Sequence, residues 1–191
     1  MMDSFSYLSV LISIILGLGV AHLLGGFAEL IKRRDSLTLW WPTPLWMITI
    51  FLIHVQTWWA LFALRDVEHW SFAAFLIVLL QPVCLFMTAS LITPRFSADG
   101  PHDLEYLYWR EHRSFFAFIL AALVASLGKD LILTGHLPEP ENVAAHGLFA
   151  LVAALALLLR SRRLQTAFAT LGLLLLCGYI AVLFTALPHP Q

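Results

Sequence analysis

Long runs of apolar residues, separated by short polar or charged segments, recur six times along the chain. A helix that crosses a bilayer needs about 20 mostly apolar residues, because the hydrocarbon core is about 30 Å thick and each residue rises about 1.5 Å. Alternation of apolar and polar positions, which would indicate strands, is absent from the sequence. The pattern predicts an all-α integral membrane protein, a single membrane domain over residues 1–191 with six transmembrane helices at Tyr7–Leu30, Pro42–Leu64, Trp70–Thr93, Ser114–Thr134, Val143–Leu159 and Leu164–Leu187.

One connection, Pro94–Arg113, is long enough to hold structure of its own. Within it, Asp99-Gly100-Pro101 is typical of a helix start, because Asp and Gly cap helices and Pro is favoured in the first turn. The residues that follow place apolar and aromatic side chains on one helical face, namely Leu104, Leu107 and Tyr108. We therefore predict a short amphipathic interfacial helix between the third and fourth spans, or an extension of the fourth span.

Composition narrows the class of protein. Hydrophobic residues make up 60% of the chain and charged residues 12%, with a mean hydropathy of +0.84. A soluble domain carries about 25% charged residues, so this chain has too little polar surface for water. The net charge of −1 and the two cysteines also exclude a nucleic-acid-binding protein and a disulfide-stapled secreted domain. We expect the lipid bilayer as a partner and no nucleic acid.

The basic residues predict the orientation. Cytoplasmic loops carry an excess of Lys and Arg. With six spans, nine of the eleven basic residues fall on one side, and only Arg65 and Lys129 lie toward the other. We therefore expect an integral inner-membrane (or plasma-membrane) protein with both termini outside. The nine are Lys32, Arg33, Arg34, Arg95, Arg110, Arg113, Arg160, Arg162 and Arg163.

Tryptophans gather near the predicted ends of the spans, where aromatic rings are enriched at the membrane interface. We interpret six of the seven tryptophans as interfacial anchors: Trp40, Trp41, Trp46, Trp58, Trp59 and Trp70.

The first span carries small residues at successive i+4 positions, Ser13, Gly17, Ala21 and Gly25. Small residues allow helix backbones to approach closely in lipid. Because Gly19 and Gly26 lie on a second face, we expect this helix to be central and packed on two sides. Its partners are helices of the same chain, a second copy in a homo-oligomer, or partner membrane subunits.

Polar side chains deep in the first three spans predict a polar core. Ionisable and strongly polar groups at such depth normally face the interior of a bundle. Pro82 should also free a backbone carbonyl near Val78, because proline has no N–H. The predicted polar core is His22, His54, Gln56 and Gln81.

A second polar group lies toward the outer side. It comprises Lys129, Asp130, Arg65, Asp66 and His146. One interpretation is that the long basic side chains reach the interface and pair with acids. The other is an outer vestibule for a solute.

These features support three functional hypotheses. The first is a non-catalytic protein that binds or conducts an ion, proton or small solute through the polar core, as a transporter or channel does. The second is a redox protein that holds haem or quinone at His22 and His54. These histidines lie at depths of about 22 Å and about 15 Å, however, and this difference is a poor match for the two axial ligands of one haem. The third is a structural accessory subunit of a membrane complex.

Catalytic and metal-binding motifs are lacking in the sequence. It has no Gly-x-Ser-x-Gly or His-Glu-x-x-His pattern, and Ser126 has no base on its own predicted helix. Cys84 and Cys177 are single thiols within apolar spans, where a thiol behaves as a small apolar residue. We therefore predict no catalytic residue, no metal site and no cofactor, with haem kept only as part of the second hypothesis.

Overall fold

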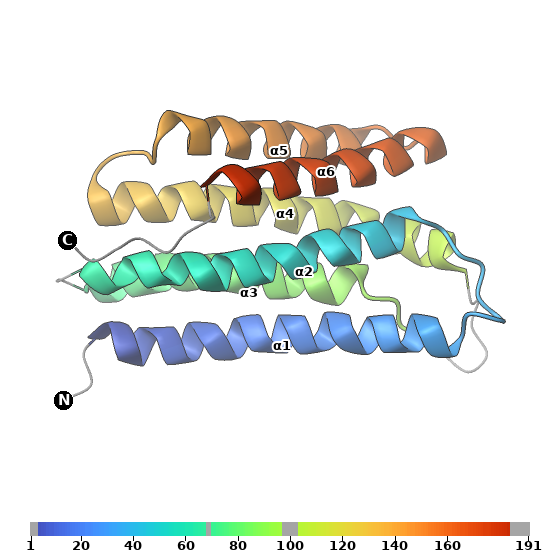
Figure 1. Ribbon diagram of the computed structural model, residues 1–191, viewed down its shortest axis with the longest axis horizontal. Helices are drawn as coiled ribbons and strands as arrows, with labels where there is room; N and C mark the ends of the chain where they lie inside the picture. Colours follow the sequence, from blue (N-terminus) through green and yellow to red (C-terminus); the bar gives the residue numbers. More distant parts are fainter. Residues whose placement is uncertain (1–3, 68–69, 97–102, 184–191) are drawn as a thin grey trace.

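The computed structural model describes residues 4–67, 70–96 and 103–183, and these form an all-helical bundle without strands. The helices run side by side along the long axis of the molecule (Figure 1). Each is long and apolar enough to cross a membrane, which indicates a multi-pass integral membrane protein. Their bounds are α1 Ser4–Lys32, α2 Pro42–Ala60 continued by the 3-10 helix η1 Leu61–Asp66, α3 Phe72–Ile92, α4 Leu104–Thr134, α5 Pro140–Leu158 and α6 Arg162–Leu183.

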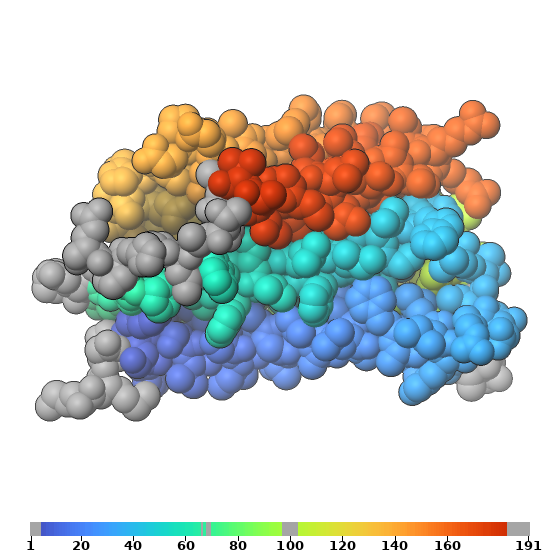
Figure 2. Space-filling view, viewed as in Figure 1, coloured from blue at the N-terminus to red at the C-terminus, as the bar shows by residue number. Residues whose placement is uncertain are grey.

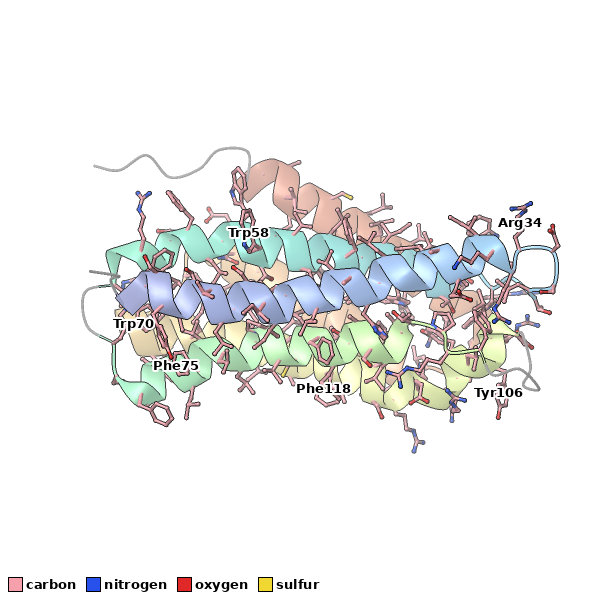
Figure 3. All side chains as sticks on the ribbon, turned by 90° about the horizontal axis from the view of Figure 1, so that it is seen from below. Arg34, Trp58, Trp70, Phe75, Tyr106 and Phe118 are labelled. Carbon is pink, nitrogen blue, oxygen red and sulfur yellow. The ribbon has the colours of Figure 1, made fainter. Side chains whose placement is uncertain are left out.

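The two ends of the bundle differ in charge. We call one the basic end, because it holds the nine basic residues named above. They lie at the end of α1 and just after it, after the end of α3, in the first part of α4, and from the α5–α6 connection into the first turn of α6. We call the other the α4–α5 end, because the loop between α4 and α5 lies there. The start of α1 lies at the same end. Figure 3 shows Arg34 and Tyr106 at the basic end, and Trp70 and Phe75 at the α4–α5 end.

Five helices form a ring, and α1 lies outside it. Going round the ring, α2 packs on α3, α3 on α4, α4 on α5, α5 on α6, and α6 returns to α2. Within the described residues, α1 contacts only α2, α3 and η1. Figure 2 shows α1 along one edge of the molecule, and Figure 3 shows it lying over α2 and α3. The prediction that the first helix is central is therefore wrong.

The face of α1 that packs is not the one with the regular stripe of small residues. Leu8, Ile12, Leu16 and Leu23 are at most 2% exposed and face α2 and α3, together with Gly19 and Gly26. On the other face, a Cβ added at Gly17 or Gly25 would have no neighbour within 4 Å. Ser13, Gly17, Ala21 and Gly25 therefore do not mediate close packing within this chain, except that Ser13 accepts a hydrogen bond from Trp58 at 3.2 Å.

The fourth helix is longer than its predicted span. Leu104–Thr134 is one continuous helix of 31 residues, or about 46 Å, which exceeds the hydrocarbon core by several turns. Residues 104–113 are thus the extension of the fourth span rather than a separate interfacial helix, since no proline interrupts them. Asp103 caps the helix by accepting from the backbone N–H of Glu105 at 2.8 Å. The predicted start at Asp99-Gly100-Pro101 lies outside the described residues, as do residues 184–187 of the sixth predicted span.

An aromatic cluster closes the centre of the ring. Trp46 of α2 is 0% exposed and makes edge-on contacts with Phe115, Phe116 and Phe149, at centroid distances of 5.3 to 6.4 Å. Gly172 of α6 lies against the same indole, so that a Cβ there would be 3.0 Å from it. Trp46 and the 8% exposed Trp40 are core residues and not interfacial anchors, a correction that follows from tertiary packing.

Candidate functional site

The five-helix ring encloses a cavity of about 440 Å³ in its α4–α5 half. Residues from all five ring helices line it, whereas α1 contributes none. Its floor is apolar and includes Ile50, Ile119 and Phe149. The rings of Trp46, Phe115 and Phe116 lie about one helical turn beyond this floor, toward the basic end, and Trp46 contacts Phe149. The cavity is therefore closed on the side of the basic end. Its polar lining residues are Gln56, Thr57, Gln81, Ser126, Lys129, Asp130, Thr134, His136, Asn142, His146 and Tyr179.

A chain of hydrogen bonds orders the wall formed by α4, α5 and α6. His146 Nδ1 lies 2.9 Å from the backbone oxygen of Asn142, and His146 Nε2 lies 3.2 Å from the hydroxyl of Ser126. Tyr179 donates to Asn142 Oδ1 at 3.0 Å, and its ring stands edge-on to that of His146. These contacts join three helices and hold the imidazole in one orientation beside the cavity.

Lys129 and Asp130 form an ion pair at the same level, with 3.4 Å between Nζ and Oδ1. Their side chains are only 16% and 26% exposed, and both line the cavity. Of the predicted outer vestibule, the structure therefore brings Lys129, Asp130 and His146 together. Arg65 lies away from the cavity lining, with its guanidinium over the ring of Phe62, and the side chain of Asp66 lies outside the described part.

The opposite wall, on α2 and α3, carries Gln56, Thr57 and Gln81. The hydroxyl of Thr57 is buried and has no hydrogen-bond partner among the described residues. Pro82 also lines this wall without ending α3, and Val78, whose carbonyl has no N–H partner four residues on, lies beside it.

The predicted polar core is divided in two by the fold. Gln56 and Gln81 face the cavity, whereas neither His22 nor His54 lines it. His54 is 0% exposed; its Nδ1 contacts the backbone oxygen of Ile50 at 2.8 Å, and its Nε2 lies against Gly19 of α1. His22 lies three residues further along α1 than Gly19, about 4.5 Å toward the basic end.

The polar cavity residues that the sequence did not identify include Ser126, Asn142, Tyr179 and Thr57. Ser126 has no base on its own helix, and its histidine partner comes from α5. Asn142 lies at the boundary of a predicted span, while Tyr179 and Thr57 lie within apolar runs. Polarity within a span is the signal that identifies such residues, but nothing in their spacing shows that they meet.

Another buried polar network lies at the basic end, outside the cavity. Gln165 is 0% exposed, accepts a hydrogen bond from Tyr108 at 2.7 Å and donates to the backbone oxygens of Ala156 and Leu159 at 2.7 and 2.8 Å. Its amide nitrogen also lies 3.2 Å from His112 Nε2. This network satisfies carbonyls at the end of α5, which have no partners within the helix, and is structural.

Within the described ranges no three His, Cys, Asp or Glu side chains gather as a metal site would require. Comparisons of the chain with protein-family models, with curated proteins and with solved structures found no match.

Proposed function

We propose that this protein binds a small solute in the cavity, which it receives from the α4–α5 end, and that it does not conduct the solute through the bundle. The observation that carries the proposal is the cavity itself, whose volume of about 440 Å³ lies within the usual range of ligand sites. Such sites combine an apolar surface with a few polar groups that orient the ligand, and this lining has both.

Closure at the basic end favours binding over conduction. The lining residues end at Ile50, Ile119 and Phe149, and the buried rings of Trp46, Phe115 and Phe116 follow immediately. A continuous polar path through His22 and His54 has no support in this geometry, because His54 packs on α1 and not on the cavity. The function therefore resembles that of a binding subunit more than that of a channel.

We place the basic end in the cytoplasm and the cavity, with both termini, on the outer face of an inner or plasma membrane. The asymmetry of nine basic residues against two supports this orientation. A cysteine in the α4–α5 loop should react with an impermeant thiol reagent in intact cells. A cysteine in the α5–α6 loop should react only after lysis, and its labelling from outside would contradict the orientation.

A redox function with haem or quinone at His22 and His54 is the alternative from another class. A haem ligand needs open space at the ligating nitrogen. At His54 that nitrogen would be 2.2 Å from a Cβ on Gly19, and the other ring nitrogen contacts a backbone carbonyl. The geometry therefore favours the solute-binding proposal. A purely structural accessory role, with or without oligomerisation through α1, requires no cavity.

Cysteine accessibility tests the cavity directly. In a background carrying Cys84→Ala and Cys177→Ala, we introduce Ala145→Cys in the cavity wall and Ala144→Cys, an exposed position on the same helix that does not line the cavity. A thiol needs water to form the reactive thiolate. We expect a charged, impermeant reagent to label Ala145→Cys and not Ala144→Cys in membranes.

Occupancy is tested by filling the cavity. Ala122→Trp places an indole in the lining, while Ala121→Trp places the same group on the exposed side of α4. We expect native mass spectrometry of the mildly solubilised wild type to show a small bound molecule that Ala122→Trp loses and Ala121→Trp keeps. An unreactive Ala145→Cys, or an adduct that both tryptophan variants retain, would contradict the proposal.

A further inference from the structure

The hydrogen bonds on the α4–α5–α6 wall determine which groups can donate to a ligand. A backbone carbonyl only accepts, so the 2.9 Å contact between His146 Nδ1 and the Asn142 oxygen places the ring proton on Nδ1. In the neutral ring Nε2 is then an acceptor, and the hydroxyl of Ser126 donates to it. Both ring nitrogens of His146 therefore have partners within the protein, and neither is available to a ligand.

Two neighbours on this wall keep donors to spare. Asn142 accepts from Tyr179 through Oδ1, which leaves both N–H groups of its amide without a partner in the described part of the chain. The ammonium of Lys129 has three N–H donors and forms an ion pair with Asp130 at 3.4 Å, but it makes no hydrogen bond among the described residues. This wall therefore offers hydrogen-bond donors to the cavity.

The wall on α2 and α3 offers groups that can donate as well. The carboxamides of Gln56 and Gln81 make no hydrogen bond within the described chain and line the cavity. Thr57 is only 5% exposed, and its hydroxyl is buried without a partner. Leaving a buried hydroxyl unpaired costs free energy, and a bound acceptor would offset that cost. Thr57 thus points independently to a ligand at this level.

The cavity also restricts the charge and polarity of its occupant. Lys129 and Asp130 neutralise one another, and the rest of the lining carries no Lys, Arg, Asp or Glu. A charged head would therefore enter a site of low dielectric without a counter-charge. The apolar floor at Ile50, Ile119 and Phe149 favours a ligand with an apolar part next to its polar head.

We propose that the cavity binds a neutral amphiphile with a ring-sized head that carries hydrogen-bond acceptors on opposite edges, which is the chemistry of a lipid-soluble quinone. One edge faces Asn142 and Lys129, and the other faces Thr57 and Gln81. The inference rests on the proposed solute-binding function and names its ligand class. It concerns binding alone and places the quinone in the cavity instead of at His22 and His54.

The test uses three probes with different heads, each attached to an apolar chain of ten or twelve carbons. They are decanol, dodecylphosphocholine and a decyl benzoquinone whose other ring positions are all substituted, so that the thiol finds no unsubstituted ring carbon to add to. Their binding is measured as protection of Ala145→Cys from the impermeant thiol reagent, and the protection must reverse when the probe is washed out. We expect the quinone to protect at much lower concentration than the other two. If decanol or the phosphocholine protects equally well, the head chemistry is wrong but solute binding stands. If no probe protects and the purified protein carries no adduct, both proposals fail.

Matched variants test which side chains of the cavity wall bind the quinone. Thr57→Val and Gln81→Leu remove one hydrogen-bonding group each with little change of volume. Thr49→Val is the control, because Thr49 is buried on the same helix but lies outside the cavity lining and bonds to the backbone oxygen of Leu45 at 2.9 Å. We expect the dissociation constant of the quinone to rise about threefold to tenfold in the first two variants, the loss of one hydrogen bond, and to stay unchanged in the control. Equal affinities in Thr57→Val and Thr49→Val would overturn the assignment.

Discussion

Alanine at Gly19 is expected to force α1 away from α2. A Cβ at this position would lie 2.2 Å from His54 Nε2 and 2.7 Å from His54 Cδ2. Ordinary van der Waals contact begins at 3.4 Å, so the ring or the helix would have to move by more than 1 Å. The imidazole cannot turn aside easily, since it is fully buried and its Nδ1 is held at 2.8 Å from the backbone oxygen of Ile50.

The size of the effect follows from overpacking. Adding a methyl group to a filled interior costs about 1–3 kcal/mol when neighbours cannot relax. The collision involves a rigid ring and two helices, so we expect the upper part of that range. Gly17→Ala provides the matched control on the same helix, because no atom lies within 4 Å of its Cβ. Alanine is the better helix former, by up to about 1 kcal/mol, so Gly17→Ala should be neutral or stabilising.

The assay is reversible unfolding of the purified protein in mixed micelles, followed by the fluorescence of its seven tryptophans. A double-mutant cycle with His54→Ala isolates the contact, because the smaller side chain removes the collision. We expect a coupling free energy of about 1–3 kcal/mol between Gly19→Ala and His54→Ala, whereas pairs without contact are additive within about 0.5 kcal/mol. If Gly19→Ala and Gly17→Ala are equally stable, or if the two substitutions in the cycle are additive, the packing of α1 on His54 is refuted.

Three further predictions concern stability. Thr57→Val should raise the free energy of unfolding of the ligand-free protein by about 1 kcal/mol in the same assay, since it removes a buried hydroxyl without a partner; a loss of stability would show that the hydroxyl is bonded. Gln165→Leu should cost about 1–3 kcal/mol and increase hydrogen exchange at the α5–α6 junction, because the carbonyls of Ala156 and Leu159 lose their donor. Asp103→Ala should cost about 0.5–2 kcal/mol through loss of the α4 cap, while Asp103→Asn should retain most of the stability; equal losses in both would contradict a capping role.

The number and limits of the helices were largely predictable because they depend on local properties. An apolar run long enough to cross a bilayer is a sum over neighbours in the chain, and all six predicted spans coincide with helices. The predicted ends of the helices were less accurate, because a helix continues beyond its apolar run only where the next residues find packing partners. The first turns of α4 continue the helix because Leu104, Leu107 and Tyr108 are buried against the bundle, with the ring of Tyr108 packed edge-on against Trp40.

The faces of the helices were not predictable in the same way. In a soluble bundle the exposed face is polar and the buried face apolar, so the sequence shows which side packs. Lipid is as apolar as a protein core, so lipid-facing and core-facing positions use the same residues. This is why the stripe containing Gly17 and Gly25 suggested packing, whereas Gly19 and Gly26 are the glycines in contact. It is also why Trp46 resembled an interfacial anchor in sequence but is fully buried.

The same distinction between local sequence and tertiary packing applies to the candidate site. The sequence alone determined that the chain is helical and apolar enough to span a membrane six times, and that a few polar side chains, among them Gln56, Gln81 and His146, lie within those spans. Only the tertiary structure decided that these meet Ser126 and Lys129 around one cavity while His54 turns to α1. Local hydropathy specifies what lies in a span, but the rotation of each helix about its axis is set by contacts between segments far apart in the chain.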